Sequence, residues 1–234
     1  MKVAIMQPYF LPYIGYFQLM SAVDEYIIYD NIEYSKKGWI NRNRILVNGS
    51  DSFITIPLKK DSDYLNIKDR QLADSWSIER KKVMSKIVES YRKAPFFKSV
   101  TEVIERSLLC EDQNLFNFIH NSLSVVKEYL EIQTPVIVSS TIKIDHTLKS
   151  EKKVIEICKA RNAINYINPI GGVDLYNRED FKKEGIVLNF LKSDNISYNQ
   201  FGNEFIPWLS IIDVMMFNSK DDIKKYLKSG YTII

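Results

Sequence analysis

The sequence has little cysteine, little net charge and no long apolar run, and each shortage argues against a class of protein. The two cysteines, Cys110 and Cys158, have no metal-site spacing, so we expect reduced, structural thiols in a cytoplasmic protein. A formal net charge of +3 gives no electrostatic footprint for nucleic acid, which we exclude as a partner. No run approaches about eighteen apolar residues, so we expect no membrane insertion. The N-terminus lacks the basic and apolar regions of a signal peptide.

Aromatic side chains are abundant instead. Fourteen Tyr, twelve Phe and three Trp suit a pocket that recognises rings or sugars, while other rings among them must belong to the core. The 234 residues suffice for one sizeable core with an appended helical part. We therefore predict one α/β domain over residues 1–234 that binds a small-molecule substrate. Nothing in the composition identifies a cofactor, a metal or an oligomeric state.

The first thirty residues predict a strand, a turn, a helix and a second strand. The apolar run Val3–Ile5 is typical of a strand covered on both faces. Pro8 and Pro12 remove backbone donors, so the chain between them must turn. From Tyr13 onward, apolar residues at helical spacing predict a short amphipathic helix, and Tyr26–Tyr29 returns to strand. Such a βαβ unit leaves its first turn at the carboxyl edge of the sheet, where open α/β sheets bind ligands.

That first turn and the helix start offer several groups to a ligand. Gln7, Tyr9 and Gly15 are candidates for substrate binding, and Tyr13 is a candidate for catalysis. A glycine near the start of a helix is costly unless something approaches its backbone closely. The alternative is that Gly15 only relieves helix packing and that the tyrosines are half-buried core residues.

The segment NIEYSKKGWINRNRILVNG follows the second strand and combines rings, amides and cations. An extended chain would have two faces: Trp39, Asn41 and Asn43 on one, and Ile40, Arg42 and Arg44 on the other. The indole and carboxamides suit a sugar, and the arginines suit a diphosphate that they can bind through two parallel hydrogen bonds. A regular strand could not aim both faces into one pocket, so a bulge or strand end is required. The alternative is a hairpin strand with a solvated basic face.

The middle of the chain predicts a hairpin, a loop and a group of helices. Asn48-Gly49 is a strong hairpin signal and leads into the strand Ser52–Leu58. Residues 59–76 are polar and without periodicity, which is typical of a lid or binding loop. Apolar stripes then predict three helices in residues 77–131, which we interpret as a helical insertion that caps the sheet.

After the helices, a buried strand is predicted at Val136–Val138 and a histidine follows it. In Asp145-His146 a histidine stands beside a carboxylate. If catalysis needs a general base near neutral pH, His146 is the best candidate on chemical grounds. The alternative is a loop histidine without a role.

A strand at Tyr166–Asn168 leads into a glycine-rich turn. Gly171 and Gly172, followed by Tyr176 and a helix from Asn177 to Glu184, form a pattern that can bind an anion through free backbone amides. The pattern has neither the lysine and spacing of a P-loop nor the spacing of a dinucleotide fingerprint. It is therefore a weak signal for a particular nucleotide. A further strand is predicted at Ile186–Leu191.

The C-terminal part contains one carboxylate in an unusual place. Phe205–Phe217 reads as a largely buried helix, where Asp213 would be costly unless it is hydrogen bonded. We interpret Asp213 either as a structural anchor for the region around Arg42 or as a functional carboxylate. Gln200, in the polar and aromatic loop before this helix, is a candidate for substrate binding. Lys220–Lys228 predicts an exposed amphipathic helix.

Three runs of the sequence, QPYFLPYIGYFQLM, YDNIEYSKKGWINRNRI and FIPWLSIIDVMMFN, resemble the WbqC-like protein family. The resemblance implies a bacterial protein of surface polysaccharide biosynthesis, either lipopolysaccharide O-antigen or capsule. A second resemblance is to nucleotidyltransferase-type α/β folds, which carry a His-x-Gly-His motif after the first strand. Here Tyr13-Ile14-Gly15-Tyr16 stands in that place. The missing imidazoles would have stabilised phosphate charge, so this analogy argues against nucleotidyl transfer.

Strands near residues 3, 27, 136, 166 and 188, separated by helices, predict an α/β fold. We expect a Rossmann-like, mostly parallel sheet with a nucleotidyltransferase-like start and the helical insertion. The predicted function is a transferase for a nucleotide-linked or lipid-linked amino sugar, by N-acyl or aminoacyl transfer. The alternatives are nucleotidyl transfer from ATP or CTP and non-catalytic binding of a sugar nucleotide. The candidates for catalysis are His146, Asp213 and Tyr13, and those for substrate binding are Gln7, Tyr9, Gly15, Trp39, Asn41, Arg42, Asn43, Gly171, Gly172, Tyr176 and Gln200.

Overall fold

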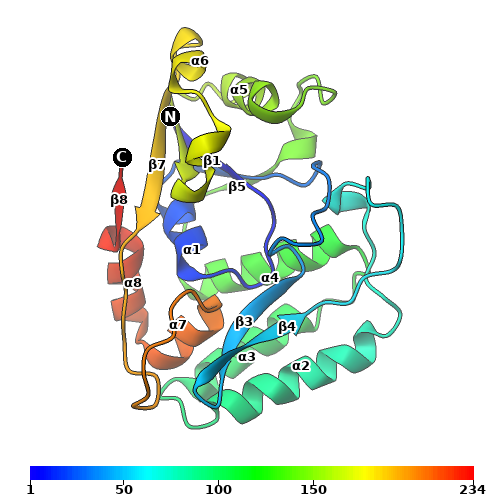
Figure 1. The fold of residues 1–234 in the computed structure, drawn as a ribbon, viewed down its shortest axis with the longest axis vertical. Coiled ribbons are helices and arrows are strands. Elements are labelled where there is room, and N and C mark those ends of the chain that lie inside the picture. The colour runs from blue at the N-terminus through cyan, green and yellow to red at the C-terminus, as the bar shows by residue number, and fades with distance from the viewer.

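A six-stranded sheet occupies one end of the molecule in the computed structural model, which describes residues 1–234 (Figure 1). Its order is β5-β2-β1-β6-β7-β8. The first five strands in this order pair in parallel and β8 pairs with β7 antiparallel. The strands are β1 (Lys2–Met6), β2 (Glu25–Ile28), β5 (Val136–Val138), β6 (Asn165–Pro169), β7 (Val187–Ser193) and β8 (Tyr231–Ile233). The prediction of an α/β fold with a mostly parallel sheet is confirmed.

The direction in which the sheet is wound reverses between β1 and β6. From β1 the chain passes outward to β2 and then β5, and it returns to the other side of β1 for β6 and β7. The connections that leave β1 and β6 therefore diverge. Such a reversal opens a crevice at the carboxyl ends of the two central strands.

Alternate residues of the central strands pack into two separate cores, as the two-residue period of a strand requires. Val3 and Ile5 face a core of 15 buried residues together with α5 (Ser150–Ala160) and α6 (Arg178–Lys183). Ala4 faces a core of 46 buried residues on the opposite side. The sheet is therefore covered on both faces, which explains the continuous apolar run of β1.

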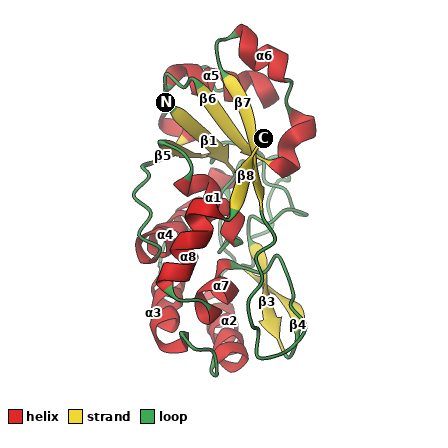
Figure 2. Cartoon of the chain, turned by 90° about the vertical axis from the view of Figure 1, so that its left-hand side faces the viewer, coloured by secondary structure: helices red, strands yellow, loops and turns green.

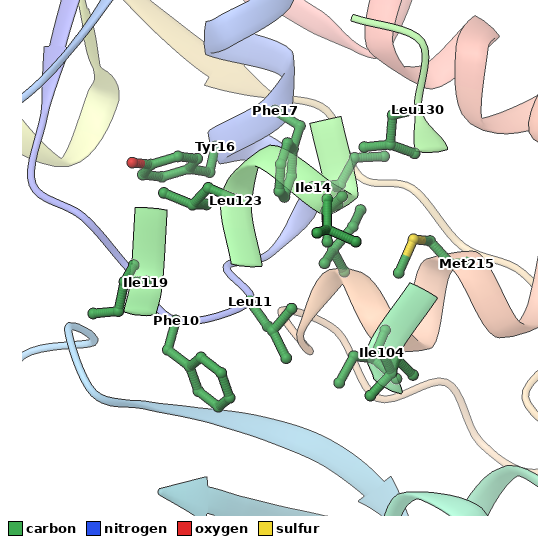
Figure 3. Packing of buried hydrophobic residues seen from close by; sticks show 14 of the residues in the cluster. Phe10, Leu11, Ile14, Tyr16, Phe17, Ile104, Ile119, Leu123, Leu130 and Met215 are labelled. Carbon is green, nitrogen blue, oxygen red and sulfur yellow. The ribbon is translucent and has the colours of Figure 1, made fainter. Parts of the chain in front are cut away.

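The larger core joins the sheet to the helices at the other end of the molecule. It contains residues of α1 (Ile14–Ser21), α2 (Trp76–Tyr91), α3 (Phe97–Leu108), α4 (Leu115–Tyr129), α7 (Ile211–Phe217) and α8 (Lys220–Ser229). Figure 3 shows Phe10, Leu11 and Phe17 among side chains of this core. The three helices predicted after residue 76 are confirmed. They lie below the sheet, next to the hairpin (Figure 2).

The hairpin consists of β3 (Arg42–Val47) and β4 (Ser50–Thr55), which pair antiparallel. Asn48 and Gly49 have φ angles of +50° and +76°. Two left-handed residues in a two-residue loop match the right-handed twist of the flanking strands. This prediction is also confirmed.

Three local predictions need correction. The first helix is buried from Ile14 to Met20 and so lacks the exposed face of an amphipathic helix; its Gln18 donates to the carbonyls of Tyr226 on α8 and of Gly230, the residue after α8. β5 is only half buried, because it is an edge strand. The helix expected from Phe205 begins at Ile211, after Trp208 at φ +62°. None of the helices is long and apolar enough to span a membrane.

Candidate functional site

A cavity of about 1400 Å³ opens at the carboxyl ends of the central strands. The segments that follow β1, β2 and β6 all contribute to it, together with the start of α5 and part of the hairpin. Its lining includes seven aromatic side chains and six charged ones: Tyr9, Tyr13, Tyr16, Tyr29, Trp39, Tyr176 and Trp208, and Glu33, Arg44, Lys68, Lys149, Glu151 and Lys153. Four cations against two carboxylates make the cavity positive.

The turn after β1 presents a free amide to the cavity. The Tyr16 hydroxyl donates to the main-chain oxygen of Gln7 at 3.1 Å and fixes the turn. The Tyr9 hydroxyl lies 3.5 Å from the side-chain oxygen of Gln7, a distance at which a hydrogen bond is long and weak. The side-chain nitrogen of Gln7 makes no hydrogen bond in the structure. Gln7 and Tyr9, both expected at a binding site, line the cavity.

Gly15 is approached closely by the ring of Tyr13, a side chain of the protein itself, and the approach of a ligand stays a prediction. A Cβ added at Gly15 would overlap the end of the Tyr13 ring and lie 2.6 Å from the Ser193 hydroxyl. The Tyr13 and Ser193 hydroxyls are 3.3 Å apart. The edge of the Tyr13 ring also packs against Trp208, with 5.6 Å between the ring centroids. Gly15 therefore allows Tyr13 to lie over the helix start, at the wall of the cavity.

Lys153 on α5 is a buried cation that the sequence analysis did not identify. Its side chain is only 4% exposed and lines the cavity. Its ammonium group donates to the main-chain oxygen of Asn31 at 3.1 Å and lies 5.1 Å from the centre of the Tyr29 ring. Burial lowers the pKa of Lys153, and the nearby Asp30 carboxylate offsets this only in part. Two of its three N–H donors have no protein acceptor, so an anion in the cavity would be well placed to receive them.

His146 also lines the cavity, and both of its ring nitrogens are occupied. Nε2 lies 2.9 Å from the main-chain oxygen of Ile142 and Nδ1 lies 2.9 Å from the Asn31 amide nitrogen. Because a carbonyl only accepts, Nε2 carries the proton and Nδ1 accepts from Asn31. Asn31 is held in turn by the Ser139 hydroxyl, which also contacts Asp30. These contacts fix the orientation of the His146 ring.

The glycine turn after β6 reaches the cavity, but the helix expected behind it does not. Gly171 and Gly172 lie in a short 3-10 segment, η3 (Ile170–Leu175), and line the cavity together with Tyr176. A Cβ at Gly172 would collide with the Asn168 amide, which lines the cavity too. No residue of α6 lines the cavity. Anion binding at this turn would therefore depend on its backbone amides without a helix end.

Two hairpin residues, Asn43 and Arg44, line the cavity together with Trp39, which lies just before the hairpin. Trp39 is 40% exposed, and the Arg44 guanidinium lies 5.6 Å from the centre of its ring. Arg44 also pairs with Asp51 at 3.3 Å. The Asn43 amide donates to the carbonyls of residues 10 and 11, so it holds the first turn in place.

The structure does not bring Asn41 or Arg42 to the cavity. The Asn41 side chain is buried, donates to the Ile56 carbonyl and accepts from the Tyr34 hydroxyl. Arg42 donates to the carbonyls of residues 37 and 38. The reason is that β3 begins only at Arg42, so the alternation expected from residue 39 onward is interrupted.

Asp213 and Gln200 also lie away from the cavity, in a buried network. The Asp213 carboxylate accepts from Tyr91 at 2.9 Å, from Tyr198 at 2.7 Å and from Gln200 at 2.7 Å. The Tyr91 hydroxyl accepts from the Leu46 amide of β3 at 2.8 Å. Burial raises the pKa of Asp213, and the three donors counteract this in part. These contacts match the first of the two interpretations of Asp213, an anchor for the strand that contains Arg42.

Lys153 had one signal in the sequence. Lys153 stands one turn before Ile157, on the same side of α5, and the other buried residues of the helix are apolar or a thiol: Val154, Ile155, Ile157 and Cys158. A lysine among such residues contrasts with the exposed lysines elsewhere. No group of three or more His, Cys, Asp or Glu side chains is arranged to hold a metal ion.

Comparison with known proteins identifies a matching family and a similar bacterial protein. The sequence matches the WbqC-like protein family over residues 7–225. It is 27% identical to the uncharacterised protein Rv1507c of Mycobacterium tuberculosis over 234 residues, which is 97% of each chain. No solved structure matches the chain at a significant level.

Proposed function

The chain belongs to the WbqC-like protein family, and from this premise and the cavity we propose that it is a transferase for a nucleotide-linked amino sugar. The reaction we propose is N-acyl or aminoacyl transfer in the cytoplasm, during assembly of a bacterial surface polysaccharide. The observation that carries the proposal is a single large, positive and ring-lined cavity at the point where the winding of the sheet reverses.

The position and size of the cavity support a nucleotide-linked substrate. Counted along the chain, the parallel strands have the order 3-2-1-4-5, which is the order of doubly wound nucleotide-binding sheets. Ligand cavities commonly measure about 300–1,000 Å³. A cavity of about 1400 Å³ therefore has room for a sugar nucleotide and an acyl donor together.

We assign the diphosphate to the region around Lys153. Its two free N–H donors, the neighbouring Lys149 and Lys68, and the amides at the start of α5 all face the same cavity. A helix N-terminus favours negative charge. A bound diphosphate would also return to Lys153 the charge stabilisation that burial removes.

We assign the sugar to the opposite wall, near Trp39, Trp208 and Tyr13. Indole and phenol rings stack on the C–H faces of sugars and accept their apolar surface. The free amide nitrogen of Gln7 can donate to a sugar hydroxyl or an acyl oxygen. Asn43 is unsuited to this task, because its amide already binds the first turn.

In the proposed reaction the sugar amine attacks the acyl carbon, a C–N bond forms and the donor's leaving group departs. The amine loses a proton, which His146 can accept at Nδ1 if its bond to Asn31 opens. No cysteine lines the cavity, so we propose direct transfer.

The test is incubation with a panel of nucleoside-diphosphate amino sugars, with acyl and aminoacyl donors and with or without ATP, followed by mass spectrometry. Lys153→Met should abolish the product. Lys152→Met, an exposed neighbour on the same helix, is the matched control and should leave product formation intact.

The outcomes separate the alternatives. A mass shift on the sugar nucleotide that depends on Lys153 supports the transferase. Calorimetric binding of the same sugar nucleotides without any product would indicate a binding protein instead. Equal product from the Lys153 and Lys152 variants would contradict the assignment of the cavity.

A second candidate is nucleotidyl transfer from ATP or CTP with magnesium. The two tyrosines of the Tyr13–Tyr16 segment do not stabilise phosphate, but Lys153 and Lys68 supply cations beside the same turn. Release of pyrophosphate on addition of a nucleoside triphosphate and a sugar phosphate would support this reaction. Its absence with all four triphosphates would end it.

A further inference from the structure

A second pocket, of about 530 Å³, lies beside the hairpin and shares no lining residue with the main cavity. Two chain segments separate the pockets, residues 31–34 and 65–70, which are joined by main-chain hydrogen bonds. Glu33 and Lys68 face the main cavity, while Tyr34 and Arg70 line the second pocket. Its volume lies within the range of small-ligand sites, about 300–1,000 Å³.

Arg70 is a buried cation without a carboxylate or a hydrogen-bond partner. The residue is 3% exposed, and its Nε and Nη2 atoms are buried and unpaired. A guanidinium is always charged, and an unpaired buried charge is strongly unfavourable. Arg161 shows the usual arrangement, because it binds the Glu25 carboxylate at 2.6 Å and 2.8 Å.

The guanidinium of Arg70 is held in a fixed position. It lies 4.7 Å from the centre of the Tyr34 ring. The Tyr34 hydroxyl donates to the side-chain oxygen of Asn41 at 2.8 Å. The Asn41 side-chain nitrogen in turn donates to the main-chain oxygen of Ile56, the residue after β4. Nε and Nη2 are buried, so Nη1 is the donor of the fixed guanidinium that an oxyanion in the pocket can reach.

The other charged residues of the pocket leave it positive. Lys36 pairs with Asp63, and Lys59 pairs with Asp74 at 2.8 Å. Lys60 and Arg70 have no carboxylate partner. One acid, Asp61, stands against these two unpaired cations in the lining.

We propose that this pocket binds a small ligand through an oxyanion, a phosphate or a carboxylate group, with Arg70 as its main contact and Lys60 as its second. The oxyanion supplies the counter-charge that the protein does not give to Arg70. The site is separate from the transferase cavity and does not depend on the function proposed for it.

The test is calorimetric titration of the full chain with inorganic phosphate and, separately, with acetate at constant ionic strength. The parent for this series carries Lys153→Met, which removes the buried cation of the main cavity. Arg70→Met is then added to it, and Arg92→Met serves as the control because Arg92 is exposed and lies outside both pockets. We expect saturable binding by the parent and by the Arg92 variant. Arg70→Met should weaken it roughly tenfold to a hundredfold, the loss expected for a charge-assisted hydrogen bond.

Preference for phosphate or for acetate identifies the oxyanion, and either preference supports the site. Equal affinity of the Arg70 variant and its parent, or no saturable binding of either anion by the parent, would overturn it. If the Arg70 variant does not fold, Lys60→Met replaces it, since Lys60 is exposed. Binding by that variant must then be weaker than binding by the parent for the proposal to stand.

Discussion

Replacement of Asp213 distinguishes an anchor from a functional carboxylate. Asp213 is fully buried and accepts three side-chain hydrogen bonds, from Tyr91, Tyr198 and Gln200. Asp213→Asn keeps the shape but turns one accepting atom into a donor. One of the three bonds is then lost and a buried donor faces another donor.

The size of the effect follows from these contacts. A buried polar group left unpaired costs about 1–3 kcal/mol. In a chain of this length each kcal/mol lowers the melting temperature by about 2–4 °C, so Asp213→Asn should lower it by roughly 2–12 °C. Asp213→Ala frees all three donors and should cost about 3–5 kcal/mol.

The destabilisation should also depend on pH. Burial raises the pKa of Asp213 in the folded state, above the value of about 3.9 in the unfolded chain. The stability that this shift contributes is therefore present below about pH 3.9 and is lost as the pH rises through the folded-state pKa. Asparagine cannot titrate, so the difference in unfolding free energy between the natural chain and Asp213→Asn should be larger near pH 4 than near pH 7.

Urea unfolding at several pH values measures this difference, and calorimetry with a sugar nucleotide below the melting temperature measures binding. The anchor role predicts lower stability with nearly unchanged affinity, since Asp213 does not line the cavity. Unchanged stability at every pH, together with lost turnover, would refute it and favour a functional carboxylate.

Four further substitutions test the cavity. Gly15→Ala should displace the Tyr13 ring, and the loss of that ring's contacts should offset a helix-propensity gain of roughly 1 kcal/mol. Calorimetry should then show weaker sugar nucleotide binding at a nearly constant melting temperature. A large fall in melting temperature with intact binding would instead make Gly15 a packing residue. Arg44→Lys should weaken binding roughly tenfold to a hundredfold and Arg42→Lys should not, because Arg44 lines the cavity and Arg42 does not; the reverse order would place Arg42, and not Arg44, at the ligand. His146→Gln should lower turnover more than affinity, and unchanged turnover would exclude it as the base.

Signals confined to a few neighbouring residues made much of the fold predictable. The apolar run Val3–Ile5 indicated a strand buried on both faces, and Asn48-Gly49 indicated the hairpin, because each pattern acts through its own backbone. The order of the strands depends on contacts between distant segments. It could not be read from such patterns.

The local errors have the same origin. The first helix was predicted to be amphipathic, but the two carbonyl acceptors of its buried Gln18, Tyr226 and Gly230, stand about two hundred residues later in the chain. The helix expected from Phe205 is delayed because Pro207 cannot donate and Trp208 is left-handed. Pro207 was a visible signal, whereas the strand β8 (Tyr231–Ile233) depends on its pairing with β7.

The candidate site could be predicted in part. Gln7, Tyr13 and Gly171 lie at one cavity because strand ends of a parallel sheet meet at one edge. Arg42 does not line the cavity. The predicted alternation of faces was counted from Trp39, whereas β3 begins three residues later, at Arg42. Lys153 and Arg70 escaped notice because burial of a cation depends on its tertiary neighbours.

The most direct measurement is a crystal structure of the chain with a bound nucleoside-diphosphate amino sugar. The proposed function predicts the ligand in the cavity at the carboxyl ends of β1 and β6. Its diphosphate should lie within hydrogen-bond distance of the Lys153 ammonium group and the start of α5, with the sugar against Trp39 or Trp208. A ligand bound outside this cavity, or a diphosphate remote from Lys153, would contradict it.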